Sequence, residues 1–318
     1  MRVLMLSLLV LAACQTAPVT PARPAAEPFY HLVDLTDDYA AFYDRTQGME
    51  TQTRVAAFKA AFIPLFPGFY EPSEGTTQEQ MDRMIARSLE QFPEIRERYM
   101  ITRASFAPDM AAAQAAFLAT FPDARPVGDI YFVHSLGRMD GGTREYNGRT
   151  YFIFGADVMA RIHTPGQARP FFNHEIFHFY HAPYFPECEA VWCSLWAEGL
   201  AVYVAEQINP GASDAALLLT TPRPIRPEVD ANLPRAACTV KAVIDSERQE
   251  DYAPLFFGNG NPAGLPPRFG YYVGYLVAKE AGRTHSVQEL AHMRPAEVRP
   301  LIDAALNTMA PTCPPPGN

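Results

Sequence analysis

The chain has 318 residues, of which 48% are apolar and 19% are charged, and this composition is typical of a folded protein with a sizeable core. The formal net charge is −9, and we find no run of Lys and Arg and no glycine-rich phosphate loop, so the sequence argues against nucleic acid as a partner. The length allows one large domain or two smaller ones.

The first residues predict an export signal. Residues 1–13 contain one early Arg and an apolar run from Val3 to Ala13, which is too short to span a bilayer comfortably. The run leads into Leu-Ala-Ala-Cys, which resembles the lipobox of bacterial lipoproteins and implies cleavage before Cys14 and lipid attachment to that residue. The alternative is an ordinary secretory signal that is cleaved nearby.

The next segment, 14–28, is rich in Pro and Ala without an apolar period, so we interpret it as an extended tether. Gln15 rather than Asp follows Cys14, which by resemblance to other lipoproteins favours the outer membrane. We therefore expect a protein of the bacterial cell envelope, anchored by lipid on the periplasmic side. In this oxidising compartment we expect at least one disulfide rather than only buried free thiols, with three possible pairings among Cys188, Cys193, Cys238 and Cys313.

The region 29–127 is predicted to be helical. Apolar residues recur at helical spacing in 34–46 and 53–66, and the alanine-rich segment 109–121 is also typical of a helix. Thr76 and Glu79 form a possible capping box ahead of a further helix over 80–92.

The pattern then changes to strands. Segments 129–136 and 149–156 are aromatic and β-branched, and the glycine-rich connection between them indicates that they pair. Helical pattern resumes afterwards, because Thr164, Pro165 and Gln167 supply an N-cap, a first-turn proline and a capping partner for a helix that ends by Pro183. We therefore expect an α+β, predominantly helical fold with a small, mainly antiparallel sheet before this helix.

This helix carries the motif His-Glu-Ile-Phe-His. His174 and His178 are four residues apart, so both imidazoles lie on one helix face and can bind one metal ion. Glu175 is rotated away from them by about a quarter turn, where it can approach a water molecule on the ion without being a ligand. The pattern HExxH therefore predicts a zinc site with Glu175 as its general base.

A catalytic zinc ion needs a third protein ligand. His181 is one candidate, but three ligands from a single straight helix lie nearly in line, so we interpret it instead as a helix-end histidine that interacts with the helix dipole. Glu198 is the other candidate, because it lies 20 positions after His178 in a second segment with helical spacing, 195–207. A turn between the two helices would bring Glu198 to the ion. Cys188 and Cys193 flank this turn, and we favour a disulfide between the ligand helices over further metal ligands.

An HExxH helix followed by a helix with Glu-Gly-x-Ala-x-Tyr resembles the gluzincins, a group of zinc peptidases that includes thermolysin and the M1-type aminopeptidases. The matching residues outside the HExxH motif are Glu198, Gly199, Ala201 and Tyr203. The segment 268–282, followed by a capping box at Ser286 and Glu289, resembles the C-terminal helices of uncharacterised predicted zinc-dependent proteases in that group. The resemblance implies a zincin-like catalytic region over 128–312, either separate from 29–127 or packed with it into one compact domain.

The sequence departs from this pattern in two places. Val202 stands where thermolysin-like enzymes have an Asp that orients a ligand His, so that role would pass to Asn173, Glu206 or a backbone carbonyl. The Gly-x-Met-x-Asn signature of M1-type aminopeptidases is missing, which argues against aminopeptidase activity.

The resemblance also implies a residue that stabilises the oxyanion from the C-terminal part. The candidates are Tyr271, Tyr272 and Tyr275, of which the pattern Gly-Tyr-Tyr-Val-Gly-Tyr favours Tyr272. The strand 149–156 would be the sheet edge along which a peptide or protein substrate lies. Two function classes remain open: a zinc-dependent hydrolase of peptide bonds, and a non-catalytic or metal-binding lipoprotein that keeps the zincin fold. The intact Glu175 favours the enzyme, because a binding protein has no need of a general base.

Overall fold

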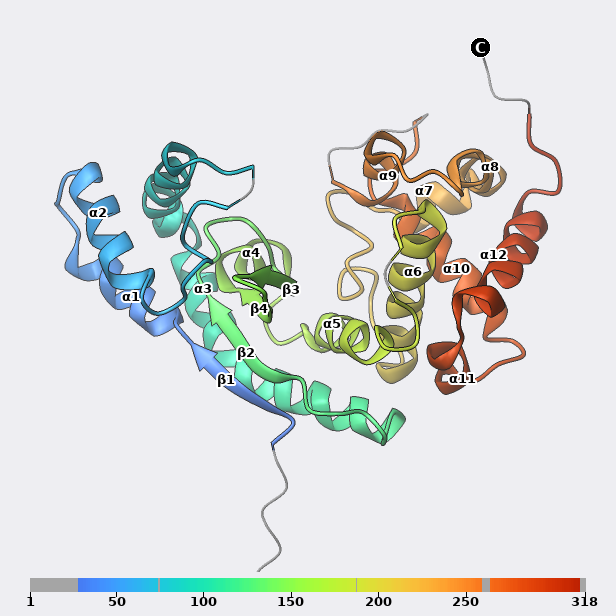
Figure 1. Cartoon of the computed structure of the whole chain (residues 1–318), viewed down its shortest axis with the longest axis horizontal. Helices are drawn as coiled ribbons and strands as arrows, with labels where there is room; N and C mark the ends of the chain where they lie inside the picture. Colours follow the sequence, from blue (N-terminus) through green and yellow to red (C-terminus); the bar gives the residue numbers. More distant parts are fainter. Residues whose placement is uncertain (1–27, 74, 187, 259–263, 315–318) are drawn as a thin grey trace, which may run out of the picture.

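A computed structural model describes residues 28–73, 75–186, 188–258 and 264–314. The predicted signal 1–13, the lipidation residue Cys14 and almost all of the predicted tether lie outside these ranges. Figure 1 shows two groups of elements on either side of a central helix, α5 (Arg169–His181). Among the described helices, none has both the length and the apolar character that crossing a membrane requires.

The first group contains a sheet and the helices before α5. Its helices are α1 (Thr36–Arg45), α2 (Thr51–Phe62), α3 (Gln78–Thr120) and α4 (Ala156–Ile162), and its strands are β1 (Tyr30–Asp34), β2 (Gly128–Val133), β3 (Gly141–Tyr146) and β4 (Arg149–Gly155). The second group is entirely helical: α6 (Val191–Ile208), α7 (Arg226–Asp230), α8 (Leu233–Val243), α9 (Gln249–Phe256), α10 (Phe269–Ala281), α11 (Val287–His292) and α12 (Pro295–Met309). The predicted α+β, mostly helical fold class is therefore confirmed.

The sheet is mixed, so the prediction of a mainly antiparallel sheet is wrong. The strand order is β1-β2-β4-β3, and β2 is parallel to both β1 and β4, whereas only β3 and β4 are antiparallel. The two predicted strands do pair, with Ile130 opposite Phe152, but the glycine-rich connection between them is itself a strand, β3. Asn147 and Gly148 both have positive φ, which suits the tight turn that joins β3 to β4. The outer edge of the sheet is consequently β3 and not β4.

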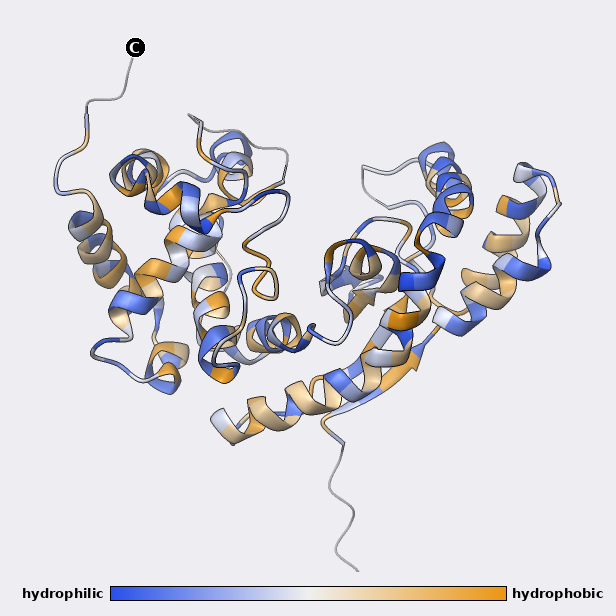
Figure 2. Ribbon diagram, turned by 180° about the vertical axis from the view of Figure 1, so that it is seen from behind, coloured by the Kyte–Doolittle hydropathy of each residue, from blue (hydrophilic) through white to orange (hydrophobic). Residues whose placement is uncertain are grey.

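The long helix α3 replaces two shorter predicted helices. It runs continuously from 78 to 120 and passes through Pro93 and Pro108. Its capping box is formed by Thr77 and Gln80, one residue later than predicted, with Gln80 N donating to Thr77 Oγ1 at 3.2 Å. Polar and apolar colours alternate along α3 in Figure 2, as expected for a helix with one buried face. The buried face recurs at helical spacing and includes Met81, Ile85, Leu89 and Phe92.

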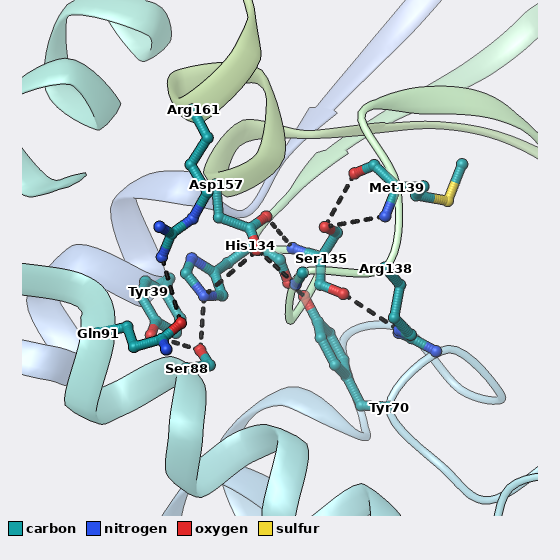
Figure 3. A network of polar contacts seen from close by, with 11 residues as sticks. Tyr39, Tyr70, Ser88, Gln91, His134, Ser135, Arg138, Met139, Asp157 and Arg161 are labelled. Atoms are coloured by element: carbon teal, nitrogen blue, oxygen red, sulfur yellow. Dashed lines mark hydrogen bonds and ion pairs between the residues drawn. The ribbon is translucent and has the colours of Figure 1, made fainter. Parts of the chain in front are cut away.

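A buried polar network fixes the chain between β2 and β3 (Figure 3). Asp157, in the first turn of α4, accepts hydrogen bonds from the backbone N–H groups of Ser135 at 2.6 Å and Gly137 at 2.7 Å. His134 stacks on Tyr39 with ring centroids 3.5 Å apart, and its Nε2 atom lies 2.6 Å from Ser88 Oγ. These contacts tie the loop after β2 to α1, α3 and α4, and the loop leads directly into the edge strand β3.

The central helix α5 begins later than predicted. Residues 164–167 form a turn, in which the Gln167 N–H donates to the Thr164 carbonyl at 3.0 Å, and the helix starts only at Arg169. Gly166 has φ +77°, a left-handed conformation that interrupts a right-handed helix. Pro170 then occupies the first turn of α5, where a missing N–H costs no helical hydrogen bond.

Helices α6 and α10 cross in direct backbone contact. A Cβ atom at Gly199 would overlap the backbone of Gly274, and one at Gly274 would overlap the carbonyl oxygen of Leu195. Two glycines are therefore required where these helices meet, which gives a packing reason for the glycine that follows Glu198.

All four cysteines of the body are paired, which confirms the predicted disulfide content. Cys188, in the loop between α5 and α6, is bonded to Cys193 in the first turn of α6. Cys238 on α8 is bonded to Cys313 near the C-terminus. The first bond thus fastens the loop to α6 and does not link the two ligand helices directly.

Candidate metal centre

The structure brings the two motif histidines and Glu198 together. His174 and His178 lie one turn apart on α5, and their Nε2 atoms are 3.0 Å apart. The Oε2 atom of Glu198, on α6, lies 3.2 Å from Nε2 of His174 and 3.4 Å from Nε2 of His178. Within the described part of the chain, this is the group of side chains whose geometry suits a metal ion.

The size of this triangle matches a tetrahedral metal site. Ligand atoms at about 2.0–2.1 Å from a zinc ion are separated from each other by about 3.3 Å, close to the three distances given above. The side chains of His174, His178 and Glu198 are 14%, 27% and 24% exposed, so the open side of the triangle is accessible from solvent. The arrangement leaves a fourth position for water or substrate.

Charge in the group suits metal binding. Burial opposes ionisation of Glu198, but the charge of His178 and hydrogen bonds from both histidines outweigh it and hold the pKa of Glu198 well below its usual range. Burial lowers the pKa of His174, which favours its neutral form. Zinc binds a carboxylate and neutral imidazoles, so binding requires His178 to lose the proton whose charge lowers the pKa of Glu198.

Glu175 lies beside the ligands, at the edge of the sheet. Its Oε2 atom is 3.6 Å from the position that a Cβ atom would take at Gly142 of β3. Burial raises the pKa of Glu175 to about 8. It therefore points toward the side of the site where β3 passes and does not join the triangle of ligand atoms.

A cavity of about 1130 Å³ opens onto the site. One wall is the segment 138–144, which includes the start of β3, and the floor is formed by α5 and α6. Residues 216–218, α9 and the start of α10 also line it, the last through Arg268 and Tyr271. The cavity is thus lined by residues from both groups of elements, together with the three ligand residues.

His181 ends α5, as predicted, but its environment differs from that of a histidine that interacts with the helix dipole. Its ring stacks on Phe177 and Phe185 with centroids 5.1 and 5.3 Å away. Burial lowers its pKa to about 3, so the ring is neutral at ordinary pH. It lies outside the group of potential ligands.

The structure does not bring Tyr272 to the cavity. Its hydroxyl group donates to Asp230 at 2.9 Å, on the far side of α10, and the Tyr275 hydroxyl donates to Glu206 at 2.7 Å. Tyr271, one residue earlier, is the tyrosine of this helix that lines the cavity. Adjacent residues on a helix differ in direction by about 100°, so the choice between them depends on how α10 is rotated against α6.

The residues predicted to support the ligand histidines are engaged elsewhere. Asn173 donates from Nδ2 to the Ala113 carbonyl of α3 at 2.8 Å and accepts from Asn209 at 2.9 Å, so it fastens α5 to α3 and α6. Glu206 accepts the hydrogen bond from Tyr275, as described above. Val202 lines the cavity as an apolar residue.

Arg268 also lines the cavity, although the sequence gives no sign of it. It precedes α10 with φ +63°, and no motif in the sequence indicates that its side chain reaches the site. Searches against family models, curated proteins and solved structures gave no match for this chain.

Proposed function

We propose that this chain is a zinc-dependent peptidase, in which His174, His178 and Glu198 hold the ion and Glu175 is the general base. The observation that carries this proposal is the triangle of two imidazole nitrogens and one carboxylate oxygen, spaced 3.0–3.4 Å apart, with a further carboxylate beside it in an open cavity. Two histidines and one carboxylate are a ligand set of catalytic zinc sites, which keep one position free.

The composition of the site supports a catalytic rather than a structural zinc ion. Structural zinc sites are closed and rich in cysteine, whereas the four described cysteines are all disulfide-bonded. The three side chains also remain partly exposed to the cavity.

Glu175 would move the proton in the reaction. A zinc ion bound here would activate a water molecule and polarise the carbonyl group of the substrate. The carboxylate of Glu175 would accept the proton of that water and deliver it to the leaving amine. Burial raises the pKa of Glu175, and the charges of His178 and Arg144 oppose this effect only in part. The charge of a bound zinc ion would lower this pKa further and favour the carboxylate form.

The substrate would be a peptide or protein that lies along β3. This strand is the free edge of the sheet beyond β4, and it passes Glu175 at Gly142. An extended peptide can add to such an edge through main-chain hydrogen bonds, which places a peptide bond across the site. A Cβ atom at Gly141 would approach the rings of Phe171 and Phe154 too closely, so a glycine is required where this strand passes α5.

The test is turnover by zinc-loaded protein together with a Glu175→Gln variant. Wild-type protein should contain one zinc per chain and cleave members of a peptide library. Glu175→Gln should keep the metal but lose at least about 10²-fold in kcat, with KM little changed, because the amide cannot accept a proton. Stoichiometric zinc without turnover of any peptide would instead favour a metal-binding lipoprotein that keeps the fold, and full activity of Glu175→Gln would exclude the mechanism.

A further inference from the structure

The proposed reaction leaves one role unfilled. When water attacks a peptide carbonyl, negative charge develops on the carbonyl oxygen, and a donor or cation fixed near that oxygen accelerates the step. Tyr272 cannot supply this help, because its hydroxyl group is bonded to Asp230 away from the cavity. The cavity wall at the start of α10 carries two other candidates, Arg268 and Tyr271.

The position of Arg268 is fixed by three contacts. One guanidinium nitrogen, Nη1, donates to the carbonyl oxygens of Leu218 and Thr221, each at 3.3 Å. The centre of the guanidinium group lies 4.5 Å from the ring centroid of Tyr271. A cation held in this way needs little reorganisation when negative charge appears beside it.

The backbone around this arginine is also unusual. Arg268 has φ +63° and Leu218, which accepts its hydrogen bond, has φ +56°. Left-handed backbone is costly for residues other than glycine, and such strain tends to occur where function requires a particular geometry. Here two strained residues from different segments meet at the wall of one cavity.

Arg268 and Glu175 line the same cavity from distant parts of the chain. Arg268 precedes α10, whereas Glu175 lies on α5 next to Gly142 of β3. A peptide bond bound in this cavity would therefore have both a proton acceptor and a fixed cation near it.

We propose that Arg268 is a catalytic residue that stabilises the oxyanion during peptide hydrolysis, a role that rests on the proposed function. As the water oxygen bonds to the carbonyl carbon, the π electron pair of the carbonyl moves to its oxygen, and Glu175 takes the water proton. The guanidinium group faces that negative oxygen. The oxyanion then collapses, the C–N bond breaks, and the proton passes from Glu175 to the leaving nitrogen.

Arg268 suits this role better than the Tyr271 hydroxyl. A guanidinium group carries a full positive charge at any pH that the protein would encounter. Tyr271 lies against the guanidinium group, and its neutral hydroxyl group can donate a hydrogen bond but carries no positive charge. Its ring therefore acts as the surface that positions Arg268.

Three variants of the full-length, zinc-loaded protein separate these roles. Arg268→Gln should lower kcat by about 10²–10³-fold, as expected for the loss of one oxyanion-stabilising group. Arg268→Lys should recover part of this loss, because lysine keeps the positive charge but lacks the planar guanidinium group that anchors Arg268. Tyr271→Phe keeps the ring and should lose less than about tenfold.

Arg226→Gln is the matched control. Arg226 also lies over tyrosine rings, 4.9 Å from Tyr272 and 5.1 Å from Tyr275, but it is outside the cavity lining. Its variant should keep the kcat of the wild type. Circular dichroism and zinc content should show that every variant is folded and loaded.

A second readout does not depend on turnover. A phosphinic peptide imitates the tetrahedral intermediate with its negatively charged oxygen, so its dissociation constant, measured by calorimetry, should rise for Arg268→Gln by a factor similar to the loss in kcat. The KM of the substrate should change by less than about threefold. Higher KM with normal kcat, or a larger loss for Tyr271→Phe than for Arg268→Gln, would overturn the role of Arg268. If Glu175→Gln abolishes activity but Arg268→Gln is as active as the wild type, this inference alone fails. If the wild type cleaves no peptide, both it and the proposed function fail.

Discussion

Replacing His134 with glutamine should make the stability of the protein less dependent on pH. His134 is 2% exposed, and burial lowers its pKa to about 4 from an ordinary value of 6.5. Because the folded pKa is depressed, the folded state favours neutral histidine. The contribution of neutral His134 to the stability of the folded state is fully present above pH 6.5. It is lost as the pH falls toward 4, because the unfolded chain takes up the proton first.

The magnitude follows from the two pKa values. With 6.5 for the unfolded state and about 4 for the folded state, protonation should cost about 2 kcal/mol of unfolding free energy at pH 5 and about 3 kcal/mol at pH 4. Glutamine can still hydrogen-bond to Ser88 but does not titrate, so His134→Gln should lack this loss.

The assay is urea unfolding followed by circular dichroism between pH 7.5 and 4, with wild type and variant compared at each pH. Other groups titrate in both proteins, so the difference between the two curves isolates His134. The variant should be less stable at pH 7.5, because it loses the stacking of the His134 ring on Tyr39, whose centroids are 3.5 Å apart. The difference in unfolding free energy between wild type and variant should decrease by about 3 kcal/mol between pH 7.5 and pH 4. A difference in unfolding free energy that stays constant over this pH range would refute the reasoning.

Three further predictions concern the metal site, the helix crossing and the anchor. Glu198→Ala should lose most of the bound zinc by elemental analysis, whereas His181→Ala should keep it; the reverse result would contradict the ligand assignment. Gly199→Ala should lower the free energy of unfolding by about 1–3 kcal/mol in chemical denaturation, because the added methyl group overlaps the backbone of α10. Gly258→Ala is the control, because a Cβ atom there has open space and should not change this free energy. Equal stability of both variants would contradict this packing. Cys14→Ser should abolish labelling by a lipid precursor and change membrane fractionation, and an unlabelled wild type that fractionates like the variant would contradict the predicted anchor.

The ligand arrangement could be anticipated from sequence because it depends on local periodicity. His174 and His178 share a helix face whatever the rest of the fold does, and a turn of moderate length suffices to return Glu198 to them. The identity of the cavity tyrosine could not be anticipated. Helix α10 is apolar on most sides, so its sequence does not reveal that Tyr271 rather than Tyr272 faces the site.

The edge strand and Arg268 were hidden for a different reason. Segment 141–146 contains two glycines and little β-branched character, and it becomes a strand because β4 offers it a partner. Arg268 reaches the cavity through left-handed backbone and through carbonyl groups 47 and 50 residues away. Both features depend on contacts between distant segments, which no short pattern encodes.

The backbone contact between α6 and α10 also determines which parts of the site can move together. With Gly199 against Gly274, no flexible side-chain layer separates the two helices, so Glu198 and the cavity wall at Arg268 belong to one rigid body. The two histidines lie on α5, which Asn173 fastens both to α3 and to Asn209 at the end of α6. Movement of α5 relative to α6 would change the distances between the histidine nitrogens and the carboxylate of Glu198. An ion bound to all three ligands would therefore hold the two helices together in addition to these contacts, and its removal would leave them held by protein contacts alone.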